Sequence, residues 1–137
     1  MLKQINQGIK SDKTYDLPIF LKNNNTLIGV IGFSNILRSN IQSSFFSYTL
    51  YNVHWNNGYC LEAVNASIHF AFKHLNLHRL EALIEPNNKK SLKLIKKTSF
   101  RREGLKKKIN ISRGKWRDHI SYALTSEDLG VKWKNRV

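Results

Sequence analysis

The chain has 137 residues, 41% of them hydrophobic, so it can bury one core but not two. Its 23 Lys and Arg residues against 9 Asp and Glu residues give a net charge of +14, which favours polyanionic or phosphorylated partners. No apolar run approaches the roughly 20 residues of a membrane span and the N-terminal stretch has no signal core, so we expect a cytoplasmic protein without membrane contact.

The first half of the chain predicts a hairpin, a third strand and a helix. Residues 17–33 form two apolar runs around the turn Asn23–Asn25, which is typical of a β-hairpin. The aromatic residues and Thr of positions 43–53 favour a third strand. Apolar residues then recur at helical spacing over 61–75, so we expect an amphipathic helix that begins near Gly58 and ends near Asn76.

The second half predicts a strand, a short helix and a second hairpin. Residues 79–85 favour a strand that Pro86 ends, and Asn88 can cap a short helix over 89–97. Strands over 105–112 and 115–124 should meet at the turn Arg113–Gly114. We expect one domain over 1–137, with 130–137 as a loose tail. The strand pairs around one helix predict an α+β fold, with a mixed, mostly antiparallel sheet flanked by helices.

A phosphate-binding loop is a candidate at the start of the predicted helix, in the sequence VHWNNGYCLEA at residues 53–63. The free amides of a first helical turn and the positive end of the helix dipole attract phosphate. The candidate donors are the amides of Asn56, Asn57, Gly58, Tyr59 and Cys60. Gly58 alone allows unrestricted close approach, so a plain strand–helix turn remains the alternative.

Positive charge is concentrated between Lys89 and Lys115. This window holds twelve basic residues and one acidic residue, Glu103, which leaves a net charge of +11. Such a density attracts RNA and other polyanions. A lysine-rich composition on solvated faces is the alternative, although it explains the number of lysines better than their clustering.

The sequence offers no evident metal site. Cys60 is the single cysteine, which excludes an intramolecular disulfide and a multi-cysteine site. His74 and His78 stand four residues apart, but no glutamate completes an HExxH pattern. Packing or surface roles are therefore expected for both histidines.

Five segments in order carry a resemblance to a known family: IGVIGFSNILR, GYCLEA, LHRLEA, EPNNKKSLKLIKKTSFRREG and GKWRDHISYALT. Together they resemble the GCN5-related N-acetyltransferases, over about Leu17 to Leu129. Within the family the chain looks most like the branch that acetylates the N-terminal alanine of ribosomal protein S5. The resemblance implies acetyl-CoA as cosubstrate and a protein N-terminus as acceptor. It also implies a chain that lacks the family's N-terminal strand and helices.

The resemblance further implies an acyl-CoA site built largely from backbone. Of the fixed positions of the family's loop, Trp55, Gly58 and Cys60, only Gly58 keeps the family's residue, and Cys60 would add a side chain beside the phosphates. Backbone NH groups toward the ligand are expected from Leu50, Tyr51, Asn52 and Val53. Ser91 matches the general acid of some relatives, with a helix cap as its alternative role, and Asn88 of the same motif is expected beside the cofactor.

No general base is evident in the sequence. An α-amino group titrates at about 7.7 to 8.0 and a lysine at about 10.4, so the absence of a base favours N-terminal amines over lysines as acceptors. Candidate auxiliaries are Tyr48, Tyr59, Glu62 and the pair Asp118 and His119, although packing explains them equally well. Two other functions remain open: a catalytically weak remnant that binds ribosomal RNA or ribosomes, and a small-molecule amine acetyltransferase.

Overall fold

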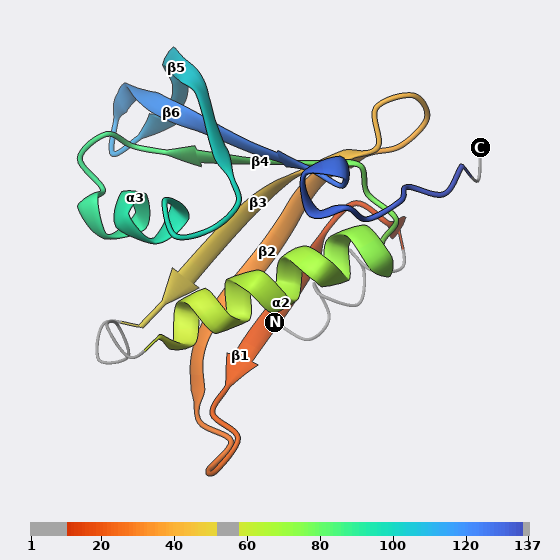
Figure 1. Cartoon of the computed structure of the whole chain (residues 1–137). Coiled ribbons are helices and arrows are strands. Elements are labelled where there is room, and N and C mark those ends of the chain that lie inside the picture. The colour runs from red at the N-terminus through yellow and green to blue at the C-terminus, as the bar shows by residue number, and fades with distance from the viewer. Residues whose placement is uncertain (1–10, 52–57, 136–137) are drawn as a thin grey trace.

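The computed structural model describes residues 11–51 and 58–135, which build one six-stranded sheet and its covering helices (Figure 1). The strand order is β1-β2-β3-β4-β6-β5. Only β3 and β4 run parallel, so the predicted mixed, mostly antiparallel sheet is confirmed. The strands are β1 (Tyr15–Phe20), β2 (Leu27–Leu37), β3 (Ser43–Leu50), β4 (Arg79–Ile84), β5 (Arg101–Ser112) and β6 (Lys115–Thr125).

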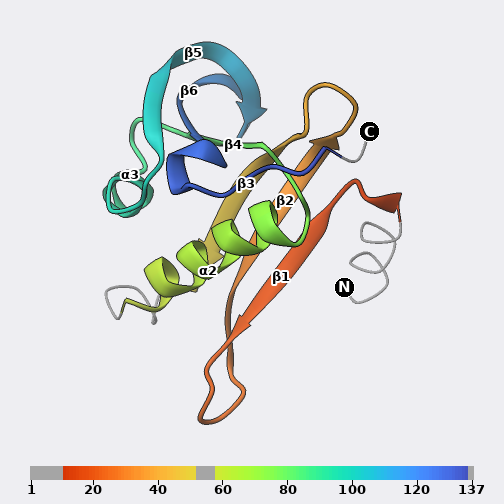
Figure 2. The same ribbon diagram turned by 45° about the vertical axis from the view of Figure 1, so that its right-hand side comes forward.

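Helix α2 (Tyr59–Lys73) lies along one face of the sheet (Figure 2), as its apolar period predicts. Its buried side chains at Cys60, Val64, Ile68 and Phe72 recur every four residues and form one stripe. The stripe joins the main hydrophobic core with apolar side chains of β2, β3 and β4. In the described residues, no helix is long and apolar enough to cross a membrane.

Two shorter elements follow the second half of the sheet. Helix α3 (Lys89–Ile95) comes after β4, and the turn of 3-10 helix η2 (Glu127–Leu129) comes after β6. Asn88 caps α3 as predicted, since its side chain accepts a hydrogen bond from the Ser91 amide. Leu94 and Ile95 are the buried residues of α3 and attach it to the core.

Strands β3 and β4 diverge along their length, which opens the sheet near its centre (Figure 1). They pair only where Ser43–Phe45 meet Arg79–Glu81. Beyond that point β3 continues along β2 and β4 continues along β6. The far end of β3 is held close to β2 at Gly29, where an added Cβ would lie 2.3 Å from the Thr49 carbonyl oxygen.

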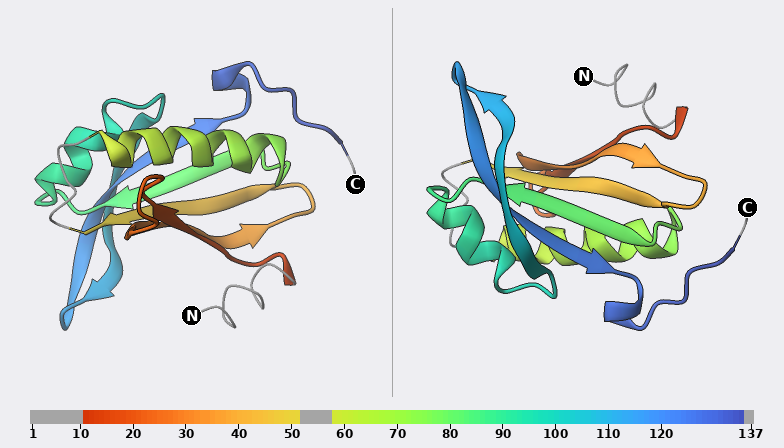
Figure 3. Two further views of the ribbon diagram at one scale, coloured as in Figure 1. Left: turned by 90° about the horizontal axis from the view of Figure 1, so that it is seen from below. Right: turned by 90° about the horizontal axis from the view of Figure 1, so that it is seen from above.

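The β5–β6 hairpin bends out of the sheet on the side away from α2 (Figure 3). Its turn is at Arg113 and Gly114, as predicted, and both residues have left-handed backbones, with φ of 50° and 74°. This is the geometry of a tight hairpin turn. The strand register shifts between Lys106 and Asn110, where Lys108 also adopts a positive φ.

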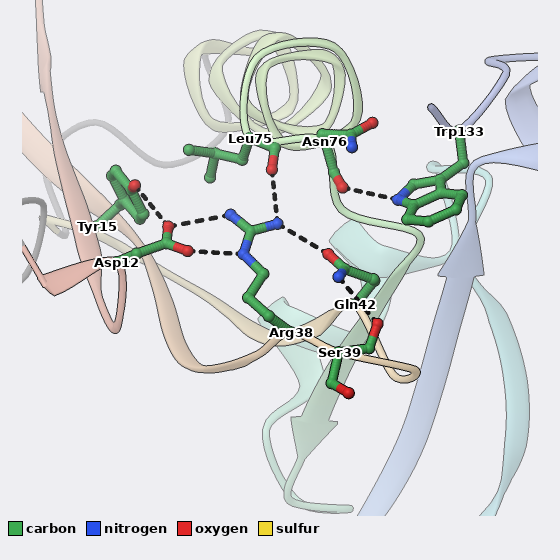
Figure 4. A network of polar contacts seen from close by, with 8 residues as sticks. All are labelled: Asp12, Tyr15, Arg38, Ser39, Gln42, Leu75, Asn76 and Trp133. Carbon is green, nitrogen blue, oxygen red and sulfur yellow. Dashed lines mark hydrogen bonds and ion pairs between the residues drawn. The ribbon is translucent and has the colours of Figure 1, made fainter. Parts of the chain in front are cut away.

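A polar cluster around Arg38 joins three distant parts of the chain (Figure 4). The guanidinium donates twice to the Asp12 carboxylate, at 2.6 and 3.0 Å, and once to the Leu75 carbonyl oxygen at 2.8 Å. It also donates to the Gln42 side chain at 3.1 Å. Tyr15 donates to Asp12 at 2.8 Å. Arg38 therefore ties the segment before β1 and the loop after β2 to the end of α2.

The C-terminal segment is docked on the chain through Asn76. This docking differs from the loose tail that the sequence led us to expect over 130–137. The Trp133 indole donates to the Asn76 backbone carbonyl at 2.9 Å (Figure 4). The Asn76 side chain donates to the Lys134 carbonyl at 2.7 Å and accepts from the Lys134 amide at 3.1 Å. These bonds hold residues 133–134 against the end of α2. Residues 136–137 lie outside the described part of the chain.

Replacing Arg38 with Met should lower the free energy of unfolding by roughly 1–3 kcal/mol, because hydrogen bonds to a charged group are lost. The Leu75 carbonyl would lose the donor that Arg38 supplies at the end of α2. Urea unfolding followed by circular dichroism measures the change. A variant as stable as the parent would show that the cluster contributes nothing to stability.

The same cluster predicts a pH dependence. The hydrogen bond from Arg38 holds the pKa of the Asp12 carboxyl below its ordinary value. A carboxyl with a lowered folded-state pKa stabilises the fold above its unfolded pKa, about 3.9, and this contribution is lost as pH falls further. Asp12→Asn should therefore flatten the decline of unfolding free energy below about pH 4. The same decline of unfolding free energy below about pH 4 in Asp12→Asn and the parent would contradict this role of Asp12.

Candidate functional site

A cleft of about 520 Å³ lies where β3 and β4 diverge. Its walls come from four places in the chain that the sheet brings together. They are Phe46, Ser47 and Tyr48 of β3; Ala82, Leu83, Ile84 and the following Glu85; Asn87, Asn88 and Ser91 around the start of α3; and Arg113 and His119 of the β5–β6 hairpin.

The backbone of β3 directs alternate amides toward this opening. The Tyr51 amide donates to the Ile28 carbonyl of the neighbouring chain segment at 2.9 Å, so it faces β2. In an antiparallel ladder the preceding residue, Leu50, directs its amide to the opposite edge, which is the edge that β4 leaves. The Leu50 amide therefore faces the opening and stays a candidate donor to a ligand. The Tyr51 amide is already bonded to Ile28, so the expectation that it faces the ligand is wrong. Asn52 and Val53 lie outside the described residues.

The start of α2 presents amides that the helix itself leaves without acceptors. Gly58 precedes the helix with a left-handed backbone, φ 75° and ψ −3°, and its carbonyl accepts from the Glu62 amide at 3.1 Å. The amides of Tyr59, Cys60 and Leu61 therefore have no acceptor within the helix. A Cβ placed on Gly58 would meet no described atom within 4 Å. This geometry suits an anion. Asn56 and Asn57 lie outside the described residues.

The side chains of the first helical turn point away from that space or into another hollow. Cys60 is 4% exposed and belongs to the core, and burial raises the pKa of its thiol to about 11. Its side chain therefore does not stand beside an anion, and the expectation that it would is corrected. Tyr59 and Glu62 line a separate hollow with Phe20. They do not join Ser91 in the cleft.

Ser91 and Tyr48 form a hydrogen-bonded pair in the cleft. The Ser91 hydroxyl donates to the Tyr48 hydroxyl at 2.9 Å, and Tyr48 donates to the Ser91 carbonyl oxygen at 2.9 Å. Burial raises the pKa of Tyr48 to about 12, so the phenol keeps its proton at neutral pH. Asn88 caps α3 by accepting from the Ser91 amide at 3.3 Å. Ser91 therefore enters the cap through its backbone, and its hydroxyl faces Tyr48.

His119 reaches the cleft without Asp118. The residue is 8% exposed, with Nδ1 3.4 Å from the Arg117 carbonyl oxygen. Asp118 instead accepts a hydrogen bond from the Lys108 amide at 2.9 Å, because neighbouring strand residues point to opposite faces. Of the two candidates, only His119 therefore lines the cleft.

An ion pair between Glu85 and Arg113, 3.1 Å apart, lines the same cleft. Sequence reasoning missed this pair because its members are 28 residues apart and neither carries a local motif. Within residues 11–51 and 58–135, no group of three His, Cys, Asp or Glu side chains is placed to hold a metal ion. His78 contacts Glu127 at 2.8 Å, and the His74 ring packs on Phe70.

Residues 1–101 match the family model described as an acetyltransferase (GNAT) domain. The chain belongs to the GNAT acetyltransferases. The family that the sequence motifs suggested is thus confirmed, and acetyl-CoA is the acyl donor of this family. The diverging β3 and β4 and the start of α2 are therefore the elements to examine for the acyl donor.

Relatives of this GNAT chain include a named ribosomal-protein acetyltransferase. The probable N-acetyltransferase YjcK of Bacillus subtilis is 32% identical over 127 residues, 93% of this chain and 70% of YjcK. The solved ribosomal-protein-S5-alanine acetyltransferase of Vibrio fischeri is 32% identical, with a TM-score of 0.87 over 98% of this chain and 71% of that one. RimJ of Mycobacterium smegmatis, solved with CoA-disulfide, is 25% identical with a TM-score of 0.87, over 93% of this chain and 60% of RimJ.

The described residues of this GNAT domain fit acetyl-CoA. The amides of Tyr59, Cys60 and Leu61, which lack acceptors within the helix, suit a pyrophosphate, and no described atom would crowd a group next to the Gly58 Cα. Along the chain, Leu50 follows the cleft residue Tyr48 by two positions and precedes the start of α2.

Proposed function

We propose that this chain is an acetyl-CoA-dependent N-acetyltransferase that acts on the N-terminal α-amino group of a protein, with a ribosomal protein as the favoured acceptor. The observation that carries the proposal is the cleft between the diverging strands, which places a hydroxyl pair, Ser91 and Tyr48, beside the open edge of β3. Support for the acceptor comes from the named activity of the similar Vibrio fischeri enzyme.

Each group in the cleft has a defined task in this proposal. When bound, acetyl-CoA supplies the acetyl group as a reactive thioester. The Leu50 amide donates a hydrogen bond toward the thioester oxygen, on which negative charge develops. Ser91 Oγ turns its proton from Tyr48 to the departing sulfur, and the proton that the attacking amine releases restores the Ser91 hydroxyl through solvent. Tyr48 holds Ser91 Oγ in place before the reaction, since it accepts from that hydroxyl and itself stays protonated.

The charges of the cleft favour an α-amine over a polyamine. Glu85 is the acidic residue that lines the cleft, and Arg113 pairs with it at 3.1 Å. A multiply charged amine would therefore meet little free negative charge there. An α-amino group needs less help to become neutral than a lysine, because its pKa is about 7.7 to 8.0 against about 10.4. His119 is the buried imidazole that lines the cleft and is the candidate proton acceptor.

The test uses three acceptors that each offer a different kind of amine. A short alanine-initiated peptide with a free N-terminus and no lysine is incubated with acetyl-CoA and the full chain. The second peptide has a blocked N-terminus and one internal lysine, and spermidine is the third acceptor. Mass spectrometry should find acetylation of the first peptide well above the other two. Preference for spermidine would establish the small-molecule alternative, and transfer to none of them would favour the catalytically weak remnant.

A further inference from the structure

The outer part of the β5–β6 hairpin, residues 105–117, carries positive charge alone. It contains six basic residues and no acidic residue: Lys106, Lys107, Lys108, Arg113, Lys115 and Arg117. This segment, called the outer hairpin below, projects from the sheet on the side away from α2 (Figure 3). Its charge is therefore presented apart from the face that the helix covers.

Ion pairs neutralise only part of this charge. Lys106 lies 3.9 Å from Glu81, and Arg113 pairs with Glu85 at 3.1 Å. Asp118 accepts from the backbone amide of Lys108, which leaves the Lys108 ammonium outside that contact. Lys107, Lys108 and Lys115 all have exposed side chains. The outer hairpin thus keeps a cluster of exposed ammonium groups.

Apolar side chains are interleaved with these cations. Trp116 is 58% exposed and lies directly across the strands from Ile111, which is 59% exposed. Ile109 is 41% exposed on the same arm. In the sequence Trp116 stands between Lys115 and Arg117. Lys115 and Arg117 themselves project to the opposite face of β6, because neighbouring strand residues alternate. An arm with an exposed indole on one face and cations on the other suits a single-stranded ligand that reaches both faces, with a base on the indole and phosphates on the cations.

We propose that the outer hairpin binds single-stranded RNA, with Trp116 stacking on a base and Lys107, Lys108 and Lys115 contacting phosphates. These four residues lie outside the acyl-transfer cleft, and their role does not depend on the proposed acceptor. Nucleic acid fits better than an anionic membrane, because the tip of the hairpin, residues 112–115, reads Ser-Arg-Gly-Lys and has no apolar residue to insert. The exposed apolar side chains lie behind that tip.

The outer hairpin also borders the cleft. Arg113, at its turn, and His119, on β6 just beyond it, both line the cleft that holds Ser91. RNA bound to the arm would therefore lie next to the cleft mouth. A protein N-terminus presented by an RNA-containing particle would reach the cleft from this side.

The test measures binding of the full chain to a fluorescently labelled ten-nucleotide single-stranded RNA by anisotropy across a series of salt concentrations. The hairpin variant replaces Lys107, Lys108 and Lys115 with Gln. The matched control replaces three other lysines with Gln and so removes the same charge. These are Lys93, Lys96 and Lys97, which are exposed on and just after α3. We expect the hairpin variant to lower the log–log salt slope by about two, since each phosphate contact in single strands contributes about 0.7.

A third variant separates stacking from charge. Trp116→Ala should weaken binding roughly ten-fold with little change in the salt slope, because stacking carries no counterion release. Equal losses in the hairpin variant and the α3 control would overturn the proposal, since net charge alone would then explain binding. Unchanged affinity in Trp116→Ala would overturn it as well. So would a chain that binds phosphatidylserine vesicles but not the RNA.

Discussion

Replacing Ser91 with Ala should lower kcat for acetyl transfer roughly 100-fold or more, with little change in the KM for acetyl-CoA, because positioned proton transfer contributes about that much. The substitution removes the hydroxyl that donates to Tyr48. It leaves the cap of α3 intact, since Asn88 accepts from the Ser91 backbone amide. Steady-state assays of CoA release, with circular dichroism as a check of folding, measure the effect.

Tyr48→Phe tests the hydrogen-bond partner of Ser91. It keeps the aromatic ring beside Phe46 but removes the hydroxyl that accepts from Ser91. If Tyr48 acts by orienting Ser91, its substitution should lower kcat in the parent and have no further effect in Ser91→Ala. Parental kcat in Ser91→Ala would show that Ser91 has no chemical role. Additive losses in the double variant would show that Tyr48 acts independently.

Gly58→Val should abolish measurable CoA binding, or weaken it at least about ten-fold, because a β-branched residue resists the left-handed backbone that starts α2. The φ of 75° at Gly58 positions the amides of Tyr59, Cys60 and Leu61 at the helix start. Space is not the obstacle, since a Cβ there would meet no described atom within 4 Å. Isothermal titration calorimetry with CoA gives the affinity.

Gly58→Asn separates backbone conformation from the mere presence of a side chain. Asn adopts left-handed backbones more readily than other non-glycine residues, so this variant should keep much more affinity than Gly58→Val. Thermal unfolding of both variants checks that α2 still forms. Similar affinity in Gly58→Val and the parent would mean that the start of α2 does not hold the pyrophosphate.

Local pattern was sufficient to predict the elements that form the site. The period of Val64, Ile68 and Phe72 predicts α2, and Arg113–Gly114 predicts the second hairpin, because both signals lie within a few neighbouring residues. The cap at Asn88 is local in the same way. These features position the cleft, the helix start and the outer hairpin.

Contacts between distant residues could not be predicted in this way. Alternation along a strand does not say which edge a given amide faces, so the sequence could not exclude the Tyr51 amide as a donor to the ligand. The pairing of Tyr51 with Ile28 decides which edge that amide faces. The docking of Trp133 depends on Asn76, 57 residues earlier. The same is true of the bond between Tyr48 and Ser91, 43 residues apart.

The most direct test of the donor site is a titration of the ¹⁵N-labelled chain with acetyl-CoA, followed by amide chemical shifts. The largest changes should fall on Gly58, Tyr59, Cys60 and Leu61 at the start of α2 and on Leu50 at the open edge of β3. The Tyr51 amide, already bonded to Ile28, should change less than Leu50. Changes confined to the outer hairpin, or no changes at millimolar acetyl-CoA, would contradict a donor site between α2 and β3.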